Sequence, residues 1–302
     1  MNQTNWVITS GKAEIKDNNI IKYKSETFKN QLGKEEILYA IVKSNVDFDN
    51  GEISFKLLSK SQLGSCQVIF YYDDSPMVIV GLNVKNWLYG IGKFNRTTNN
   101  FETLSGTGLP ETFQTKQEHS IKVKVNGSMI DLFVNDVLVC GAFEQLRQSQ
   151  IAFFFLSNDE IMVKDINITT KKPKAFIVMQ FTEEYNNLYS EVIKPVVEEF
   201  GFECERGDEA NTTNPILQDI IQSIRQCSVI IADITPNNPN VFYEVGYAHA
   251  TNKPTILLSD RKRDKLPFDI SGFRTLFYDN TIAGKTAVEK SLKKYLSNLT
   301  VK

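Results

Sequence analysis

The sequence contains few of the residues on which common catalytic centres and membrane proteins depend. Its 302 residues include two histidines, His119 and His249, and four cysteines without a CxxC pair. A zinc site or a serine–histidine triad is therefore not expected, and we predict no metal site. No apolar run approaches the roughly 20 residues that span a bilayer, and the first residues lack a signal segment, so we expect a cytoplasmic protein without membrane contact.

An excess of charge is also missing. The 34 Lys and Arg residues nearly balance the 36 Asp and Glu residues, which leaves a formal net charge of −2. Without a positive field to attract phosphate backbones, no nucleic-acid partner is expected, whereas a small nucleotide or nucleoside remains compatible with this balance. The length suffices for two domains that each bury a core of their own.

The first half of the chain has the pattern of an all-β protein. Between residues 52 and 168, short apolar or alternating runs such as EISFKLL, MVIVGL and IAFFFLS are separated by turn residues. Such runs, without helical periodicity, predict a β-sandwich. In HSIKVKVNGSMIDLFVNDVLVCG, the pairs Asn126-Gly127 and Asn135-Asp136 predict two tight turns, and hence three antiparallel strands in a row.

This order of strand, NG turn, strand, ND turn and strand resembles the concanavalin A-like sandwich domains, which include laminin-G-like modules. The resemblance covers roughly residues 1–170. It implies a concanavalin A-like β-sandwich that serves as a sensor or binding domain, with a glycan or a protein as its ligand.

A polar break, TTKKPK at residues 169–174, predicts a boundary before a second domain at 173–302. After it, KAFIVMQF forms a continuous apolar run, and the apolar residues of YNNLYSEVIKPVVEEFG recur at helical intervals. Pro195 predicts a bend in that helix, and Gly201 predicts its end. The continuing alternation of strands and helices indicates an α/β, flavodoxin-like parallel sheet covered on both faces.

In such a sheet, ligands bind at the carboxyl ends of the strands, where the strand order reverses. The polar or aromatic residues expected at these ends are Gln180, Phe181, Arg206, Asp208, Asp233, Asn240 and Glu244. We therefore predict that they converge on one site. The basic run DRKRDK, residues 260–265, is interpreted as either a gate over this site or a solvated loop.

Glu244 lies in DITPNNPNVFYEVGYAHA, one turn into a predicted helix. The helix dipole is expected to favour its ionised form, which suits a carboxylate that binds a ribose diol, stabilises an oxocarbenium-like centre or attacks an anomeric carbon. All three roles belong to N-glycosidic bond chemistry. The alternative is that the dipole alone explains a glutamate near the start of a helix.

Three segments carry a second resemblance: AFIVMQF, LYSEVIKPVVEEFGFECERGDE and SVIIADITPNNPNVFYEVGYAHATNKPTILL. Over about residues 173–280 they resemble TIR-like domains and nucleoside 2-deoxyribosyltransferase-like proteins. The resemblance implies that Glu244 is catalytic, as a nucleophile toward the sugar C1′ or as a ribose ligand during NAD cleavage. It also matches Asp233 and Asn240 to the D and the last N of the family motif D-x-T-x-x-N-P-N, and it implies that Tyr243 lines the site. Gln180 departs from the proline of many relatives, which puts the accepted base in question.

The leading expectation is an enzyme that cleaves the nicotinamide–ribose bond of NAD, with NAD as substrate and no separate cofactor. TIR-like relatives further imply a role in bacterial antiphage defence. A homo-oligomer is compatible with the sequence, which does not fix the oligomeric state. One alternative is a nucleoside 2-deoxyribosyltransferase or nucleoside hydrolase that uses Glu244 as its nucleophile. The other is a non-catalytic scaffold that binds a glycan or a protein. The substrate separates the two enzymes, and Glu244→Gln separates both from the scaffold.

Overall fold

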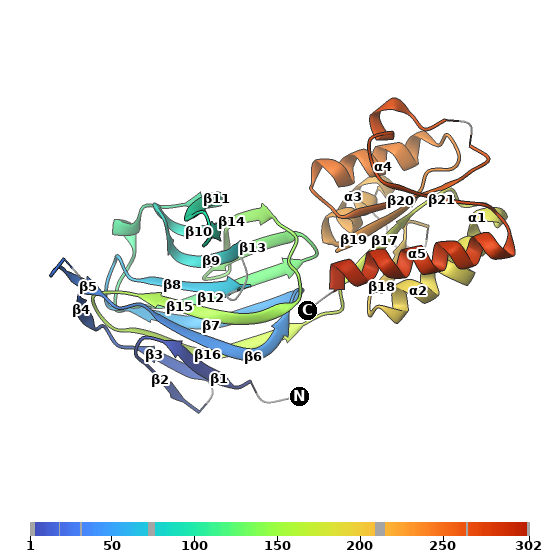
Figure 1. Ribbon diagram of the computed structural model, residues 1–302. Helices are drawn as coiled ribbons and strands as arrows, with labels where there is room; N and C mark the ends of the chain where they lie inside the picture. The colour runs from blue at the N-terminus through green and yellow to red at the C-terminus, as the bar shows by residue number, and fades with distance from the viewer. Residues whose placement is uncertain are drawn as a thin grey trace. The chain divides into compact units, whose positions relative to one another are not determined.

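The computed structural model describes residues 4–17, 19–30, 32–71, 76–208, 215–263 and 265–300, and the chain divides into two compact units (Figure 1). The first, here called the β unit, consists of residues 1–125, 130–142 and 148–170. The second, the α/β unit, consists of residues 126–129, 143–147 and 171–302. No helix in the described part of the chain is long and apolar enough to span a bilayer.

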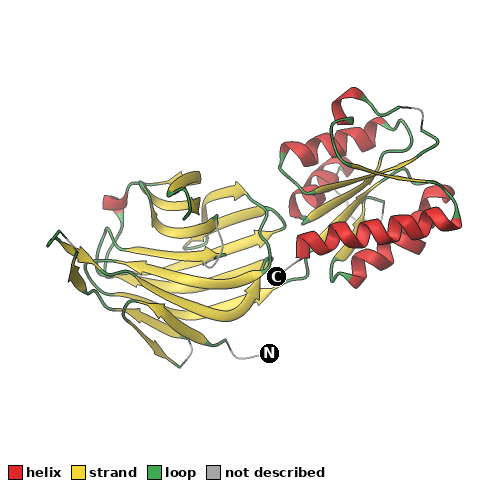
Figure 2. Cartoon of the chain, viewed as in Figure 1, coloured by secondary structure: helices red, strands yellow, loops and turns green. Residues whose placement is uncertain are grey.

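The β unit is built from two seven-stranded antiparallel sheets, and Figure 2 shows it as strands and loops with a short helical turn, η1 (Pro110–Thr112). The first sheet has the order β1 (Trp6–Ser10), β6 (Ala40–Phe48), β15 (Ser149–Leu156), β8 (Ser65–Phe70), β9 (Met77–Val84), β10 (Trp87–Asn95) and β11 (Asn100–Thr107). The second has the order β14 (Val137–Phe143), β13 (Met129–Val134), β12 (Glu118–Asn126), β7 (Gly51–Ser59), β16 (Ile161–Thr170), β3 (Ile20–Tyr23) and β2 (Ala13–Lys16). A separate hairpin pairs β4 (Thr27–Lys29) with β5 (Glu35–Ile37). The predicted β-sandwich is confirmed.

The hairpins predicted from the NG and ND pairs are present, because β14, β13 and β12 are neighbours in that order. Asn135 and Asp136 both have positive φ, 51° and 64°, as a tight two-residue turn requires. At the other turn only Gly127 has positive φ, 60°, while Asn126 still belongs to strand β12. The turn therefore begins one residue later than the NG pair predicted.

Alternate side chains of these strands form the core of the sandwich. Phe153 is fully buried in this core, with its ring centroid 5.4 Å from that of Trp6 and 5.0 Å from that of Phe55. Trp6 is buried, whereas Trp87, on β10, is partly exposed. Both tryptophans of the chain thus belong to the β unit.

The α/β unit contains a five-stranded parallel sheet with the order β18, β17, β19, β20 and β21. The first strand in sequence, β17, lies between the second and the third, so the strand order reverses between β17 and β19. The predicted parallel sheet is confirmed. Its strands are β17 (Lys174–Val178), β18 (Glu203–Arg206), β19 (Val229–Asp233), β20 (Thr255–Asp260) and β21 (Thr275–Tyr278).

Helices cover both faces of this sheet, as its continuous apolar strands require (Figure 1). Neighbouring strand residues alternate between two hydrophobic clusters: Ile231 packs with the helices of one face, and Ile230 with those of the other. The first face carries α1 (Glu183–Leu188), the π-helical turn η2 (Tyr189–Ile193), α2 (Lys194–Glu199) and α5 (Ile282–Thr300). The second carries α3 (Ile216–Gln226), α4 (Pro239–Ala250) and the 3-10 turn η3 (Phe268–Ile270).

The bend predicted at Pro195 takes the form of a π-helical turn. The N–H of Lys194 donates to the carbonyl oxygen of Tyr189, five residues back. Pro195 lacks an N–H and would clash with the carbonyl group four residues earlier in a regular helix, and the wider turn avoids this conflict. The helix ends as predicted at Gly201, whose φ of 81° is the left-handed conformation that glycine adopts readily.

Candidate functional site

A pocket of about 390 Å³ lies at the carboxyl ends of β17 and β19, where the strand order reverses. Its volume falls within the range of roughly 300–1,000 Å³ that is usual for small-molecule sites. Three segments form its walls: the residues after β17, the first turns of α3, and the start of α4. The lining residues are Met179, Gln180, Phe181, Ile216, Leu217, Ile220, Asn238, Asn240, Val241, Tyr243 and Glu244.

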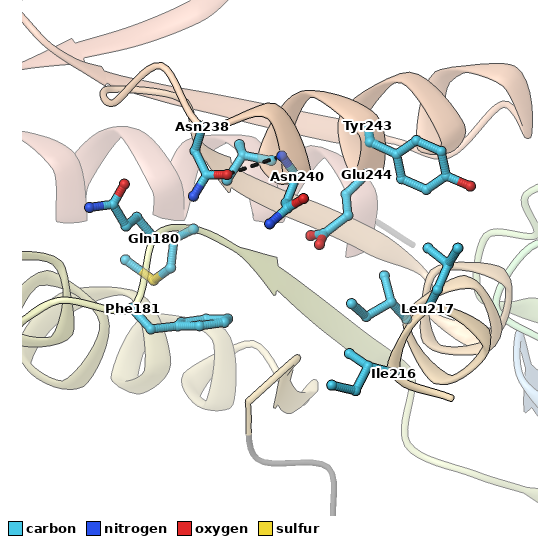
Figure 3. Close-up of a pocket in the computed structure, with 11 residues that line it drawn as sticks. Gln180, Phe181, Ile216, Leu217, Asn238, Asn240, Tyr243 and Glu244 are labelled. Carbon is cyan, nitrogen blue, oxygen red and sulfur yellow. Dashed lines mark hydrogen bonds between the residues drawn. The ribbon is translucent and has the colours of Figure 1, made fainter. Parts of the chain in front are cut away.

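The start of α4 is fixed by its own sequence. Asn238 is the N-cap, and its Oδ1 accepts a hydrogen bond from the backbone N–H of Asn240 at 3.0 Å. Pro239 occupies the first helical position, where its missing N–H has no cost. Glu244 follows as the sixth residue of the helix, and Figure 3 shows its carboxylate and the Asn240 amide directed into the same space.

Burial dominates the electrostatics of Glu244. Desolvation raises the pKa of its carboxyl group to about 7, from the ordinary value of 4.5. The expectation that the helix dipole favours the ionised form is therefore wrong: the dipole acts within the first turn, and Glu244 lies beyond it. No donor among the described residues hydrogen-bonds to this carboxylate, so nothing in that part of the chain offsets the loss of water.

Two amide side chains in the pocket are free to bind a ligand. Neither the Gln180 nor the Asn240 side chain has a hydrogen-bond partner among the described residues, although both line the pocket. Asn238 uses its Oδ1 in the cap, which leaves its amide N–H groups. Amides supply donors and acceptors without charge, and such groups bind sugar hydroxyls and the edges of bases.

The remaining wall is apolar. Phe181 lies across the pocket from Glu244 (Figure 3) and exposes 48% of its surface, although it is aromatic. Ile216 and Leu217, at the start of α3, are also exposed, and they line the pocket. Neither residue was predicted from the sequence, although two large apolar side chains directly after a proline, in the first turn of a helix, are a recognisable pattern. Tyr243 lines the pocket with its ring turned outward (Figure 3).

Arg206 and Asp208 do not line the pocket as predicted, because they bind each other. The Arg206 guanidinium donates from Nε and Nη2 to the two carboxylate oxygens of Asp208, both at 2.6 Å, and from Nη1 to Oδ1 of Asn186 at 2.8 Å. Its Cζ lies 4.4 Å from the ring centre of Tyr189 and 5.2 Å from that of Phe181. Arg206 therefore supports the aromatic wall from behind.

Asp233 is likewise absent from the lining residues, since it points into the protein. Its carboxylate is buried, and it accepts hydrogen bonds from the Tyr278 hydroxyl at 2.6 Å and from the Thr235 backbone N–H at 2.8 Å. Burial raises the pKa of Asp233, while these hydrogen bonds oppose that rise. The structure thus brings five predicted residues to the pocket, namely Gln180, Phe181, Asn240, Tyr243 and Glu244, and directs three elsewhere, namely Arg206, Asp208 and Asp233.

The pocket carries little charge. Among the described residues that line it, Glu244 is the one with an ordinarily charged side chain, and none is a lysine, arginine or histidine. His249, on the same helix as Glu244, stacks on Phe273 with 4.1 Å between ring centroids.

Comparison with known proteins gives one family and several sandwich folds. Residues 177–292 match the family model of nucleoside 2-deoxyribosyltransferase. No curated protein sequence matches the chain. Similar solved structures include the carbohydrate-binding module CBM66 from Bacillus subtilis, at 12% identity and a TM-score of 0.43 over 55% of this chain and 95% of that one. A Bacillus subtilis protein with a galectin-like fold is also similar, at 10% identity and a TM-score of 0.38 over 54% of this chain and 87% of that one. So is a lichenase from a mouse hindgut metagenome, at 10% identity and a TM-score of 0.37 over 55% of this chain and 92% of that one.

Proposed function

From the nucleoside 2-deoxyribosyltransferase-like domain at residues 177–292, which is typical of enzymes that act on N-glycosidic bonds, we propose that this protein breaks the bond between a base and its sugar. Glu244 is the reacting group in this proposal. The observation that carries it is a single, partly buried carboxylate without a hydrogen-bond donor among the described residues, which faces a pocket at the switch point of the sheet.

The chemistry requires one nucleophile and one leaving group. A Glu244 carboxylate oxygen forms a bond to the sugar C1′ while the bond from C1′ to the base nitrogen breaks. The electron pair leaves with the base, which takes up a proton from solvent. A second base or a water molecule then attacks C1′, loses its proton and releases the carboxylate. A base as acceptor gives transfer, and water gives hydrolysis.

The lining favours an uncharged nucleoside over NAD. The pyrophosphate of NAD carries negative charge that would need cations or several N–H donors, whereas the described lining offers amides and apolar side chains. The Arg206 guanidinium lies next to Phe181, but its hydrogen-bond donors are already used by Asp208 and Asn186. NAD cleavage, with the defence role that TIR-like relatives suggest, is the second candidate, supported by the motif around Glu244.

A substrate comparison tests the proposal. The purified full-length chain is incubated with a deoxynucleoside plus a second free base, with the corresponding 5′-monophosphate, and with NAD, and the products are separated by chromatography. We expect base exchange or free base from the nucleoside, less from the monophosphate and no nicotinamide from NAD. Nicotinamide release without reaction of the nucleoside would transfer the proposal to NAD, and reaction with none of the three would favour a binding scaffold.

The raised pKa of Glu244 predicts how the rate depends on pH. Because the nucleophile must be ionised, kcat/KM for the nucleoside should rise with pH and level off above about 7, where the carboxyl group has lost its proton. An ordinary glutamate would already be ionised near pH 5. Initial rates between pH 5 and 9 give this profile, and a rate that falls across pH 7 would show that Glu244 works as an acid.

A further inference from the structure

The basic run DRKRDK begins at Asp260, the last residue of β20, and continues into the loop that follows. One side chain of this loop reaches the loop that precedes α4. Arg263 donates from Nη1 to the carbonyl oxygens of Ile234 and Thr235, the latter at 2.7 Å, and from Nη2 to Oδ1 of Asn237. Its Nε donates to the carbonyl oxygen of Lys265 at 3.0 Å. One guanidinium therefore joins two loops that lie 26 to 29 residues apart in the sequence.

The loop held in this way determines where α4 begins. Residues 234–237 connect β19 to Asn238, the N-cap of α4. Asn238 lines the pocket, and the other polar lining residues of α4 follow it. The Arg263 guanidinium also lies 5.6 Å from the ring centre of Phe242, one turn further along the helix. Arg263 thus contacts the chain on both sides of the N-cap, although it is not one of the pocket-lining residues.

The contacts need the shape of arginine. A guanidinium presents five N–H donors in a fixed plane, so it can bind several carbonyl oxygens at once and still lie over an aromatic ring. A lysine has the same charge but concentrates it at one nitrogen, without a plane to lie over the ring. No carboxylate among the described residues forms an ion pair with Arg263, so its described partners are neutral acceptors.

The rest of the loop is anchored by a second set of contacts. The Thr235 hydroxyl accepts a hydrogen bond from the backbone N–H of Asp260 at 2.9 Å and lies 3.3 Å from the Tyr278 hydroxyl. These contacts fix the beginning of the loop next to β20 and β21. Asn237, closer to the helix, is held through Arg263. Loss of the guanidinium should therefore loosen the second half of the loop more than the first.

We propose that Arg263 is a positioning residue for the candidate active site, which holds residues 234–237 so that α4 starts at Asn238 and presents its polar side chains to the ligand. The catalytic part of this inference rests on the proposed function, whereas the ordering of the loop does not. Arg261 in the same run differs, because it is exposed and pairs with Asp279 at 3.6 Å. The two arginines of DRKRDK therefore differ in environment, and Asp264 of the same run lies outside the described residues.

Hydrogen exchange tests the structural part. Deuterium uptake is measured by mass spectrometry on the full-length chain, on Arg263→Lys and Arg263→Ala, and on Arg261→Ala as the matched control. We expect peptides that cover residues 236–243 to exchange at least about tenfold faster in both Arg263 variants, since local opening of the loop becomes more frequent. Peptides from β19 should keep the wild-type rate, and so should every peptide of Arg261→Ala.

Kinetics on the nucleoside test the catalytic part. Arg263→Lys should lower kcat/KM about 10- to 100-fold, mainly through kcat, because a small displacement of a reacting group has a cost of this order. In Arg263→Ala, millimolar guanidinium should restore part of the lost rate by occupying the vacated space. The same addition should have no effect on Arg261→Ala, which should react at the wild-type rate.

Each outcome decides one part of the inference. Unchanged exchange at residues 236–243 in both Arg263 variants would overturn the positioning role, whatever the kinetics. Faster exchange together with wild-type kcat/KM would confine Arg263 to loop stability and would overturn its catalytic relevance. If even the wild-type chain reacts with no substrate, the proposed function fails, while the exchange data still decide whether Arg263 orders the loop.

Discussion

Replacement of Glu244 by glutamine is expected to lower the rate of N-glycosidic bond cleavage by at least about 10³-fold. Glutamine has almost the same shape and can occupy the same position in the pocket, but its amide cannot form the bond to C1′. Substrate affinity should change much less, since Gln180, Asn240 and the apolar wall are unaltered. The measurement is kcat and KM for the best nucleoside, with ligand binding followed by calorimetry.

The matched control is Glu184→Gln, which alters a glutamate of the same unit that is exposed and accepts a hydrogen bond from Asn280 at 2.9 Å. This variant should keep the wild-type rate. A Glu244→Gln variant that retains more than about a tenth of the activity would exclude nucleophilic catalysis by Glu244. If binding and kcat fall together, Glu244 serves to hold the sugar in both the ground state and the transition state.

The same substitution is expected to stabilise the α/β unit at alkaline pH. A glutamate whose pKa is raised by burial lowers the stability of the folded state wherever the unfolded chain has released the proton that the folded chain still holds. Well below pH 4.5 Glu244 is protonated in the folded and the unfolded chain, so it has no effect. Between pH 4.5 and about 7 the folded state progressively loses up to about 3 kcal/mol, and the loss is complete above pH 7. Glutamine does not ionise and avoids this loss.

Urea denaturation at pH 5 and pH 8.5 measures the difference. The two units can be followed separately, because both tryptophans lie in the β unit while the long helices belong to the α/β unit. Circular dichroism at 222 nm should show Glu244→Gln more stable than wild type at pH 8.5, by several times the difference at pH 5. Tryptophan fluorescence should be the same in both proteins. Equal helical transitions at both values of pH would mean that Glu244 is not desolvated.

The parts of the site that depend on topology were predictable from the sequence. Alternating strands and helices place the ends of the parallel strands at one edge, which brought Gln180, Phe181 and Asn240 to the same place as Glu244. The position of Glu244 on a helix also followed from the spacing of the motif. These inferences need the order of the elements and no knowledge of where a side chain points.

The orientation of side chains was not predictable in the same way. Asp233 stands at the end of a strand, where a ligand-binding residue is expected. Its carboxylate nevertheless turns toward Tyr278, 45 residues later in the chain. Arg206 has the charge that a phosphate site would need, yet Asp208 and Asn186 satisfy it. The pKa of Glu244 is raised because neighbouring segments exclude water from the carboxylate. Its position near the start of a helix, taken alone, suggested a lowered pKa.

The π-helical turn η2 has a consequence for how this pocket tolerates changes in chain length. A π turn holds one residue more than a regular helical turn, so deletion of one residue within 189–193 would leave only enough residues for regular α-helical geometry. The relative rotation of α1 and α2 would change little, because four α-helical residues turn the chain about as far as five π-helical ones. The Pro195 ring would instead be forced against the carbonyl group four residues earlier, at a cost of about 3 kcal/mol. A single codon lost far from Glu244 would thereby weaken the helix that carries Asn186, the residue that binds the Arg206 guanidinium beside Phe181.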